Sequence, residues 1–210
     1  QTVVPLSSLI PETKTFAIRA LSRSGAIAAW LQQRTVRGLL YAGADFVAPA
    51  TTFAKTLAIP GLLIRGAADS SKLIAANPDY SDTKPVLRVF NPSDKPAKFT
   101  AQINGVSANA FGTVIVEEVA PKSVRDFAID QLANGDYSAF ISADQNITAA
   151  IRMARSDATK KPNTDFTWLQ SAEIFTGERR MTVPAAGISK LTIANPNDKT
   201  ASVTVNATNY

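Results

Sequence analysis

One stretch of sequence occurs twice in the chain, and this repeat constrains the fold more than any other feature. Residues 86–103 read VLRVFNPSDKPAKFTAQI, and residues 190–207 read KLTIANPNDKTASVTVNA. Residues 87–102 match residues 191–206 without a gap at seven of sixteen positions, at an offset of 104. Both copies alternate apolar and polar residues on each side of an Asn-Pro-x-Asp-Lys turn, which is typical of antiparallel strands with one buried face. The repeat therefore predicts a strand, a turn and a second strand in each copy.

The residue types of the shared turn explain why the chain bends there. Proline keeps the residue before it extended and fixes φ at the first turn position. Asp94 and Asp198 can bond back to the backbone of their turns. We therefore interpret both turns as hairpins. In the alternative, Asn91 with Asp94, or Asn195 with Asp198, holds a cation. Calcium requires about six to eight oxygen ligands, and neither turn has a dense carboxylate cluster.

A weaker similarity links the N-terminal part of the chain to its middle. Residues 26–31 resemble residues 147–152, and residues 44–50 resemble residues 164–172, so an Ala-Ala strand followed by Asp-Phe occurs in both places. The N-terminal segment thus carries the back half of a repeat unit, and the C-terminal segment carries a front half. Because half a sandwich cannot bury its inner face alone, we expect the two segments to meet and complete one unit. In the alternative, this chain is a piece of a longer array of such units.

Alternating patterns predict further strands at residues 15–22, 113–119, 138–142, 147–154, 166–172 and 179–183. Turn residues separate strands of this kind about every 8–12 residues, which indicates sandwiches rather than alternating strands and helices. We predict an all-β chain with little helix, built from two immunoglobulin-like or fibronectin III-like antiparallel β-sandwiches related by the internal repeat.

The repeat also predicts how the chain is divided into domains. Residues 1–66 plus 176–210 form the split sandwich, and residues 84–175 form the continuous one. Residues 67–83 are a linker or supply an extra strand. A short helix within residues 65–79 is the alternative for that segment.

The composition excludes several classes of catalytic and metal site. The sequence contains no histidine and no cysteine, so it can build no disulfide, thiolate nucleophile, Ser-His-Asp triad or structural zinc site. Glu117 and Glu118 are adjacent in a predicted strand and point to opposite faces, which disfavours a glycosidase pair. Ser-Lys pairs at residues 70–72 and 81–84 lack the helical spacing of serine acyl enzymes. We therefore expect a protein that is not an enzyme, with no cofactor and no metal.

The charge pattern indicates a solvated surface. The net charge of +5 comes from 22 basic and 17 acidic residues, and only Lys160-Lys161 and Arg179-Arg180 form adjacent basic pairs. A nucleic-acid binder concentrates its basic residues on a stripe or arm, so we expect no nucleic-acid partner. The longest apolar stretches, such as residues 25–31, are far shorter than the roughly twenty residues of a membrane span. We therefore expect no membrane span in this chain.

Aromatic side chains offer the better binding hypothesis. An aromatic face beside Asn and Asp suits a pyranose ring, and Arg179 and Arg180 follow a glycine turn where they could contact an anion. The speculative ligand contacts are Trp30, Tyr41, Tyr80, Trp168, Arg179 and Arg180. Two alternatives stay open: the tryptophans are core or interdomain residues, and the arginines lie on a solvated hairpin.

Several segments in order carry a resemblance to a known family. They are LRVFNPSD at residues 87–94, VAPKSV at 119–124, LANGDYSAFI at 132–141, the Ala-rich strand at 147–153 and DFTW at 165–168. This series resembles an actinobacterial family of uncharacterised exported proteins, domain of unknown function 5719. The Ala-Pro-Lys-Ser run departs from the smaller residues of the family pattern. The resemblance implies an exported, envelope-associated β-sandwich protein of unknown function, with no catalytic residues to carry over.

The expected function is a non-catalytic structural or protein-interaction module of the cell envelope. Its expected partner is an envelope protein or a glycan, and its expected location is extracellular or in the envelope, with the signal or anchor outside this chain. The alternative is a module that binds cell-wall glycan through exposed aromatic side chains.

Overall fold

The computed structural model describes residues 3–6, 15–37, 40–50, 52–64, 84–106, 111–130, 132–157, 163–172, 174–181 and 189–206. Nine strands lie in these segments: β1 (Leu31–Arg37), β2 (Leu40–Val47), β3 (Ala54–Ile64), β4 (Val86–Asn91), β5 (Ala97–Gly105), β6 (Thr113–Val119), β7 (Ser123–Ala128), β8 (Gly135–Asp157) and β9 (Asn163–Gln170). No α-helix occurs in the described part, and every strand pair is antiparallel. The predicted all-β class is confirmed.

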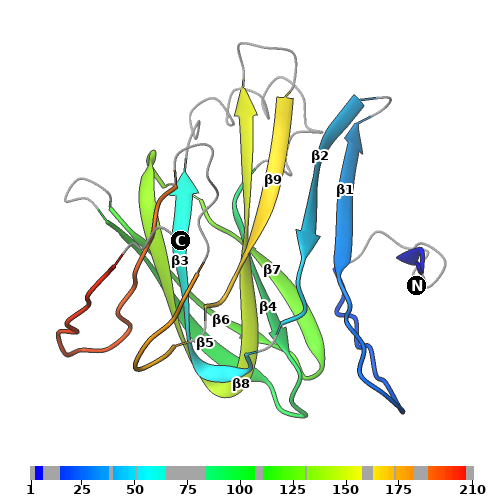
Figure 1. The fold of residues 1–210 in the computed structure, drawn as a ribbon, viewed down its shortest axis with the longest axis horizontal. Coiled ribbons are helices and arrows are strands. Elements are labelled where there is room, and N and C mark those ends of the chain that lie inside the picture. The colour runs from blue at the N-terminus through cyan, green and yellow to red at the C-terminus, as the bar shows by residue number, and fades with distance from the viewer. Residues whose placement is uncertain are drawn as a thin grey trace.

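Seven of the strands form one bent sheet, a nearly closed barrel, around the long strand β8 (Figure 1). β8 has 23 residues. Its first half pairs with β3 and β5, and its second half pairs with β4 and β9. β6 extends the sheet from β5, and β7 extends it from β4. β6 and β7 are therefore the two ends of the path along which these strands pair.

The interior of the barrel is filled by apolar side chains from β3 to β8, with Leu169 of β9 packed against them. β5 shows the origin of this core, because its residues alternate between buried and exposed along the strand. Phe99 of β5 meets Phe127 of β7 edge to face, with ring centroids 5.2 Å apart. This contact joins strands from different parts of the sheet across the core. The buried Tyr137 donates its hydroxyl proton to the carbonyl of Ala133 at 2.9 Å, so its polar end is satisfied.

The first Asn-Pro turn, residues 91–96, is organised by its asparagine; we call it the Asn91 arch. Asn91 is fully buried. Its side-chain amide donates to the carbonyls of Lys95, Val119 and Ala120 at 2.7, 3.0 and 3.2 Å. Its side-chain oxygen accepts from the backbone N–H and the hydroxyl of Ser93, at 3.0 and 2.7 Å. One side chain thereby closes the turn and fastens it to the end of β6.

The interpretation of this turn as a hairpin is wrong. β4 and β5 do not pair with each other; β4 pairs with β7 and β8, while β5 pairs with β6 and β8. The turn is an arch that carries the chain from one part of the sheet to another. Asp94 does not close it either, because its carboxylate pairs with exposed Lys122 at 2.7 Å.

The second Asn-Pro turn, residues 195–200, repeats the hydrogen bonds that the asparagine makes within the turn; we call it the Asn195 arch. Asn195 donates to the carbonyl of Lys199 at 2.7 Å and accepts from the backbone N–H of Asn197 at 3.1 Å. The side chain of Asn197 also donates to Asn195, as Ser93 does to Asn91. Its arms, residues 189–194 and 201–206, contain no strand in the structure.

The two terminal parts of the chain lie on opposite sides of the barrel (Figure 1). β1 and β2 form a separate two-stranded sheet. The described residues hold one barrel-like unit and this hairpin, so the predicted pair of related sandwiches is not confirmed. The division into residues 1–66 plus 176–210 and residues 84–175 stays a prediction, although β3 pairs with β8 of the continuous part. Residues 67–83 lie outside the described part.

Four further strand predictions differ from the structure. The segments 138–142 and 147–154 belong to one strand, β8, because the residues between them stay extended instead of turning, although the register with β3 shifts there. Residues 15–22 are described and form no strand. Of residues 179–183, the described ones, 179–181, are not in a strand either.

Candidate functional site

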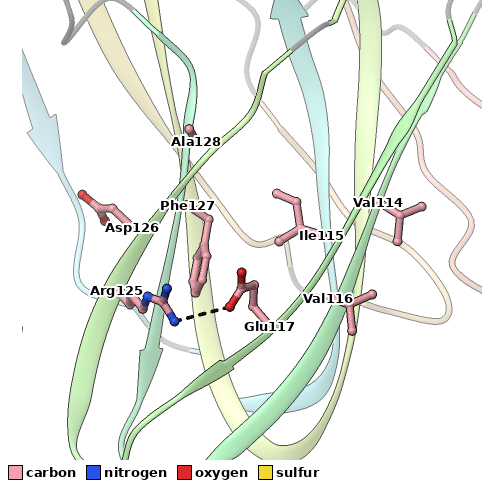
Figure 2. A pocket seen from close by; sticks show the side chains of 8 residues that line it. All are labelled: Val114, Ile115, Val116, Glu117, Arg125, Asp126, Phe127 and Ala128. Carbon is pink, nitrogen blue, oxygen red and sulfur yellow. Dashed lines mark hydrogen bonds and ion pairs between the residues drawn. The ribbon is translucent and has the colours of Figure 1, made fainter.

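The two ends of the bent sheet face each other across an open groove of about 490 Å³ (Figure 2). β6 pairs only with β5 and β7 only with β4 among the described strands, so one edge of each is unpaired. The groove is lined by Val114, Ile115, Val116, Glu117, Arg125, Asp126, Phe127 and Ala128. An unpaired strand edge offers backbone N–H and C=O groups to an added strand.

The sequence of β6 favours a strand, and part of this strand presents apolar side chains to solvent. Its sequence TVIVEEV is rich in β-branched residues, which favour extended backbone. Val114 is 58% exposed and Val116 is 71% exposed, so both present apolar surface outside the core. Val119, at the end of the strand, is fully buried and fixes β6 to the barrel. The strand therefore has an anchored end and an open apolar stretch.

Charged groups occupy the other part of the groove. Arg125 of β7 pairs with Glu117 of β6 at 3.3 Å, the dashed contact in Figure 2. The same arginine donates to the carbonyl of Glu118 at 3.3 Å and lies over the ring of Phe127, 4.8 Å from its centroid. Both charges of the ion pair are about half exposed, so solvent screens it and it contributes little to stability. Arg125 thus bridges the two edges by a contact that an incoming group can replace.

A second polar cluster joins the β1–β2 hairpin to the barrel at Trp168 of β9. Asp45 of β2 accepts from the backbone N–H of Trp168 at 2.6 Å and from the hydroxyl of Thr167 at 3.1 Å. The indole N–H of Trp168 donates to Gln33 of β1 at 2.7 Å. Arg88 lies over the indole ring, 4.4 Å from its centroid. Trp168 is thus a docking residue between the β1–β2 hairpin and β9.

Arg88 belongs to the same cluster through a second contact. Its guanidinium makes two hydrogen bonds, of 2.7 and 2.8 Å, to the carboxylate of Asp126. Asp126 also lines the groove, so the docking cluster and the groove share this residue. Gly43 of β2 allows the hairpin to lie close to β9. An added Cβ would lie 2.8 Å from a carboxylate oxygen of Asp165, and the φ of +118° also favours glycine.

The structure does not bring the remaining predicted contacts together with Trp168. Trp30 is 69% exposed in the segment before β1. Arg180 pairs with Glu178 at 2.6 Å, and Arg179 lies over the ring of Phe175 at 4.9 Å, all at exposed positions. The side chain of Tyr41 and the whole of Tyr80 lie outside the described part.

The described part also bears on the cation alternative. The Asn91 side-chain oxygen is engaged with Ser93, and Asp94 is paired with Lys122. No group of three or more acidic side chains that could hold a metal ion occurs among the described residues. No helix long and apolar enough to cross a membrane occurs among the described residues.

Sequence reasoning missed the groove and most of the docking cluster. Val114 and Val116 belong to a strand whose existence was predicted, but their exposure depends on β6 being an end of the sheet. Asp45 carried a signal, because it belongs to the Asp-Phe pattern shared with residues 165–166. In both places the aspartate accepts from the backbone N–H of the following phenylalanine, at 2.8 and 2.9 Å.

A family model described as "Family of unknown function (DUF5719)" matches residues 1–210 of the chain. No curated protein matches the chain. Among solved structures, one titled "Crystal Structure of Thermotoga maritima 1070" is similar at 14% identity with a TM-score of 0.43, covering 57% of this chain and 94% of its own. An Anabaena sensory rhodopsin transducer is similar at 12% identity with a TM-score of 0.33, covering 48% and 83%. At these TM-scores neither likeness establishes a shared fold.

Proposed function

The chain belongs to the family of unknown function DUF5719, and from that premise we propose that it is a non-catalytic, exported protein of an actinobacterial cell envelope. It acts as a structural or protein-interaction module. The observation that supports this proposal is the groove between β6 and β7, where two unpaired strand edges meet an exposed apolar stretch.

The geometry of the groove favours an extended polypeptide as its occupant. A bound segment would continue the sheet from β6 and use the unpaired backbone groups of that edge for affinity. Val114 and Val116 would contact its apolar side chains on one face of β6, while Glu117, with Arg125, would select polar ones on the opposite face. The partner class is therefore an extended segment of another envelope protein with alternating apolar residues.

A peptide-binding experiment tests this proposal. We expect a library of labelled extended peptides to contain alternating sequences that bind, with hydrogen exchange slowed in β6 and β7 and unchanged in β9. The double variant Val114→Lys, Val116→Lys should weaken binding at least about tenfold, which corresponds to about 1.4 kcal/mol. Both valines are exposed, so the variant should keep its fold.

The matched control is Val106→Lys, because Val106 is 65% exposed and does not line the groove. This variant should bind as the wild type does. A library without a binder, or binding that protects β9 instead of β6 and β7, would contradict the proposed role of the groove.

A second candidate function, recognition of cell-wall glycan, is favoured by the 69% exposure of Trp30. An exposed indole ring provides a stacking surface for a sugar. On a glycan array, binding that Trp30→Ala abolishes while the circular dichroism spectrum is unchanged would favour this function over the groove. Trp168 is a poorer test, since its substitution also removes the hydrogen bond to Gln33.

The absence of catalysis is also a prediction. A broad hydrolase screen should detect no turnover by the purified chain. Turnover that Glu117→Gln or another single carboxylate substitution removes would replace the proposed function by an enzymatic one.

A further inference from the structure

Two segments on opposite sides of the molecule have strand-like sequence and no strand partner. They are residues 26–30, before β1, and residues 189–194, the first arm of the Asn195 arch. Within the described part, neither makes a backbone hydrogen bond to another segment. Leu191 and Ile193 are 48% and 53% exposed, and Ile27 and Trp30 are 61% and 69% exposed.

The arm is held near the barrel by side chains alone. Lys190 pairs with Asp136 at the start of β8, at 2.6 Å. Thr192 lies beside Gly61 of β3, where an added Cβ would be 3.6 Å from its hydroxyl oxygen. These contacts fix the position of the arm and leave its apolar side chains half exposed.

The middle of the chain shows how the equivalent segments pair. By the repeat, residues 190–194 correspond to residues 86–90 of β4, and residues 27–31 correspond to residues 148–152 of β8. β4 and β8 are antiparallel neighbours, with Leu87 opposite Ile151 and Val89 opposite Ala149. All four of these side chains are buried, so this pairing is part of the core.

We propose that the two segments pair in the same register between two copies of the chain. Lys190 to Ala194 of one copy then run antiparallel to Ile27 to Leu31 of a second copy. Leu191 lies opposite Trp30 and Ile193 opposite Ala28, which removes two half-exposed apolar side chains and an exposed indole from water. The pairing gives the segment before β1 a strand partner, and it meets the β1–β2 hairpin at Leu31, which is opposite Val47.

The second copy, rather than the same chain, is the occupant because of where the segments lie. Figure 1 places the N-terminal segment and the C-terminal arm at opposite sides of the barrel. Joining different surfaces of successive copies is a heterologous contact, which continues from copy to copy unless a ring closes. The assembly is therefore a head-to-tail row of molecules. It goes beyond the proposed function and uses another surface, so the peptide experiment on the groove can fail without affecting it.

Disulfide cross-linking tests the register, because the natural chain contains no cysteine. Thr192→Cys and Ala29→Cys are prepared as two separate variants and mixed under mild oxidation. Transferring the pairing of Arg88 with Ala150 places these two positions opposite each other. Ile193→Cys with Ala28→Cys tests the neighbouring position, since successive pairs in an antiparallel ladder differ in the separation of their Cβ atoms.

We expect the mixed variants to give a heterodimer at least about tenfold faster than a mismatched control, which corresponds to about 1.4 kcal/mol. The control is Thr192→Cys with Ser24→Cys, because Ser24 lies five residues before Ala29, in the bend of residues 23–25 and outside the proposed pairing. A chain carrying both Thr192→Cys and Ala29→Cys should give a ladder of dimers, trimers and longer products on a non-reducing gel.

Two results would overturn the proposal. A cyclised monomer from the double-cysteine chain would mean that the two segments meet within one molecule, as the split domain requires. Equal cross-linking of the matched and mismatched pairs would mean that the register does not exist. Cross-linking should also fall at least about tenfold when Leu191→Lys is added, and remain unchanged with Val106→Lys.

Discussion

The two Asn-Pro arches share their turn and differ in everything around it. In both, the asparagine donates to the carbonyl four residues on at 2.7 Å and accepts from the backbone N–H two residues on. The Asn91 arch nevertheless connects two buried strands, whereas the Asn195 arch connects two arms that form no strand in the described part. The same local sequence therefore gives the same turn in two different environments.

The difference lies in the neighbours that each arch has. β4 lies between β7 and β8, and Leu87 and Val89 are fully buried there. Their counterparts Leu191 and Ile193 are 48% and 53% exposed, and no strand of the described residues pairs with them on either side. The turn depends on hydrogen bonds within six residues, but a strand requires cross-strand packing that only distant segments supply.

The largest expected effect comes from shortening equivalent leucines in the two copies. Leu87→Ala should lower the free energy of unfolding by about 2–5 kcal/mol, because it empties a buried site. Leu191→Ala should change it by less than about 0.5 kcal/mol at low protein concentration, because that side chain is half exposed. Urea denaturation followed by circular dichroism measures both values. Equal losses would mean that the second copy is also packed into a core.

The two asparagines should differ by a smaller amount. Asn91→Ala leaves the buried carbonyl of Val119 without this donor and opens the turn, which should cost about 2–3 kcal/mol. Asn195→Ala opens an exposed turn whose groups water can satisfy, so it should cost less than about 1 kcal/mol. Thermal unfolding of both variants beside the wild type checks the difference. If the losses agree, the turn itself and not its burial determines the contribution.

Five of the nine strands, β4, β5, β6, β8 and β9, lie in segments that the sequence predicts as strands because their signals are local, whereas β1, β2, β3 and β7 were not predicted. Residues 113–119 alternate and are β-branched, and β6 has these bounds. The alternation in β5 likewise marked the buried face that the structure shows. The arch at Asn91 was located correctly but interpreted as a hairpin, since a turn sequence does not specify whether its two strands pair with each other.

The arrangement of the strands could not be predicted in the same way. The sequence predicted two strands in place of β8. No local pattern shows that a single strand of 23 residues continues through its bend and pairs in both halves of the sheet. The pairing of β3 with β8 joins residues far apart in sequence. Which strands become ends of the sheet follows only from the complete set of pairings.

The same limit explains the outcome for the candidate site. The groove exists because β6 and β7 are ends of the sheet. No pattern in the sequence therefore marks Val116 and Arg125 as groove residues. The prediction of Trp168 as a ligand contact stays a prediction. Its role as a docking residue depends on Gln33 and Asp45, which approach it only through the folded hairpin.

The smallest expected effect concerns what holds the Asn195 arch in place. Lys190 and Asp136 are 61% and 33% exposed, so their ion pair should contribute less than about 1 kcal/mol. Asp136→Asn should leave global unfolding nearly unchanged and raise the rate of chymotryptic cleavage after Leu191 about two- to fivefold, the range that about 0.5–1 kcal/mol corresponds to.

Salt at about 1 M, where the Debye length is about 3 Å, should raise cleavage of the wild type but hardly that of the variant. Asp144→Asn, on the same strand and away from Lys190, serves as the control and should behave as the wild type. Cleavage that is insensitive to both salt and Asp136→Asn would show that the arm is held by its packing near Gly61 instead, and the second arch would then be closer to the first than its exposed residues suggest.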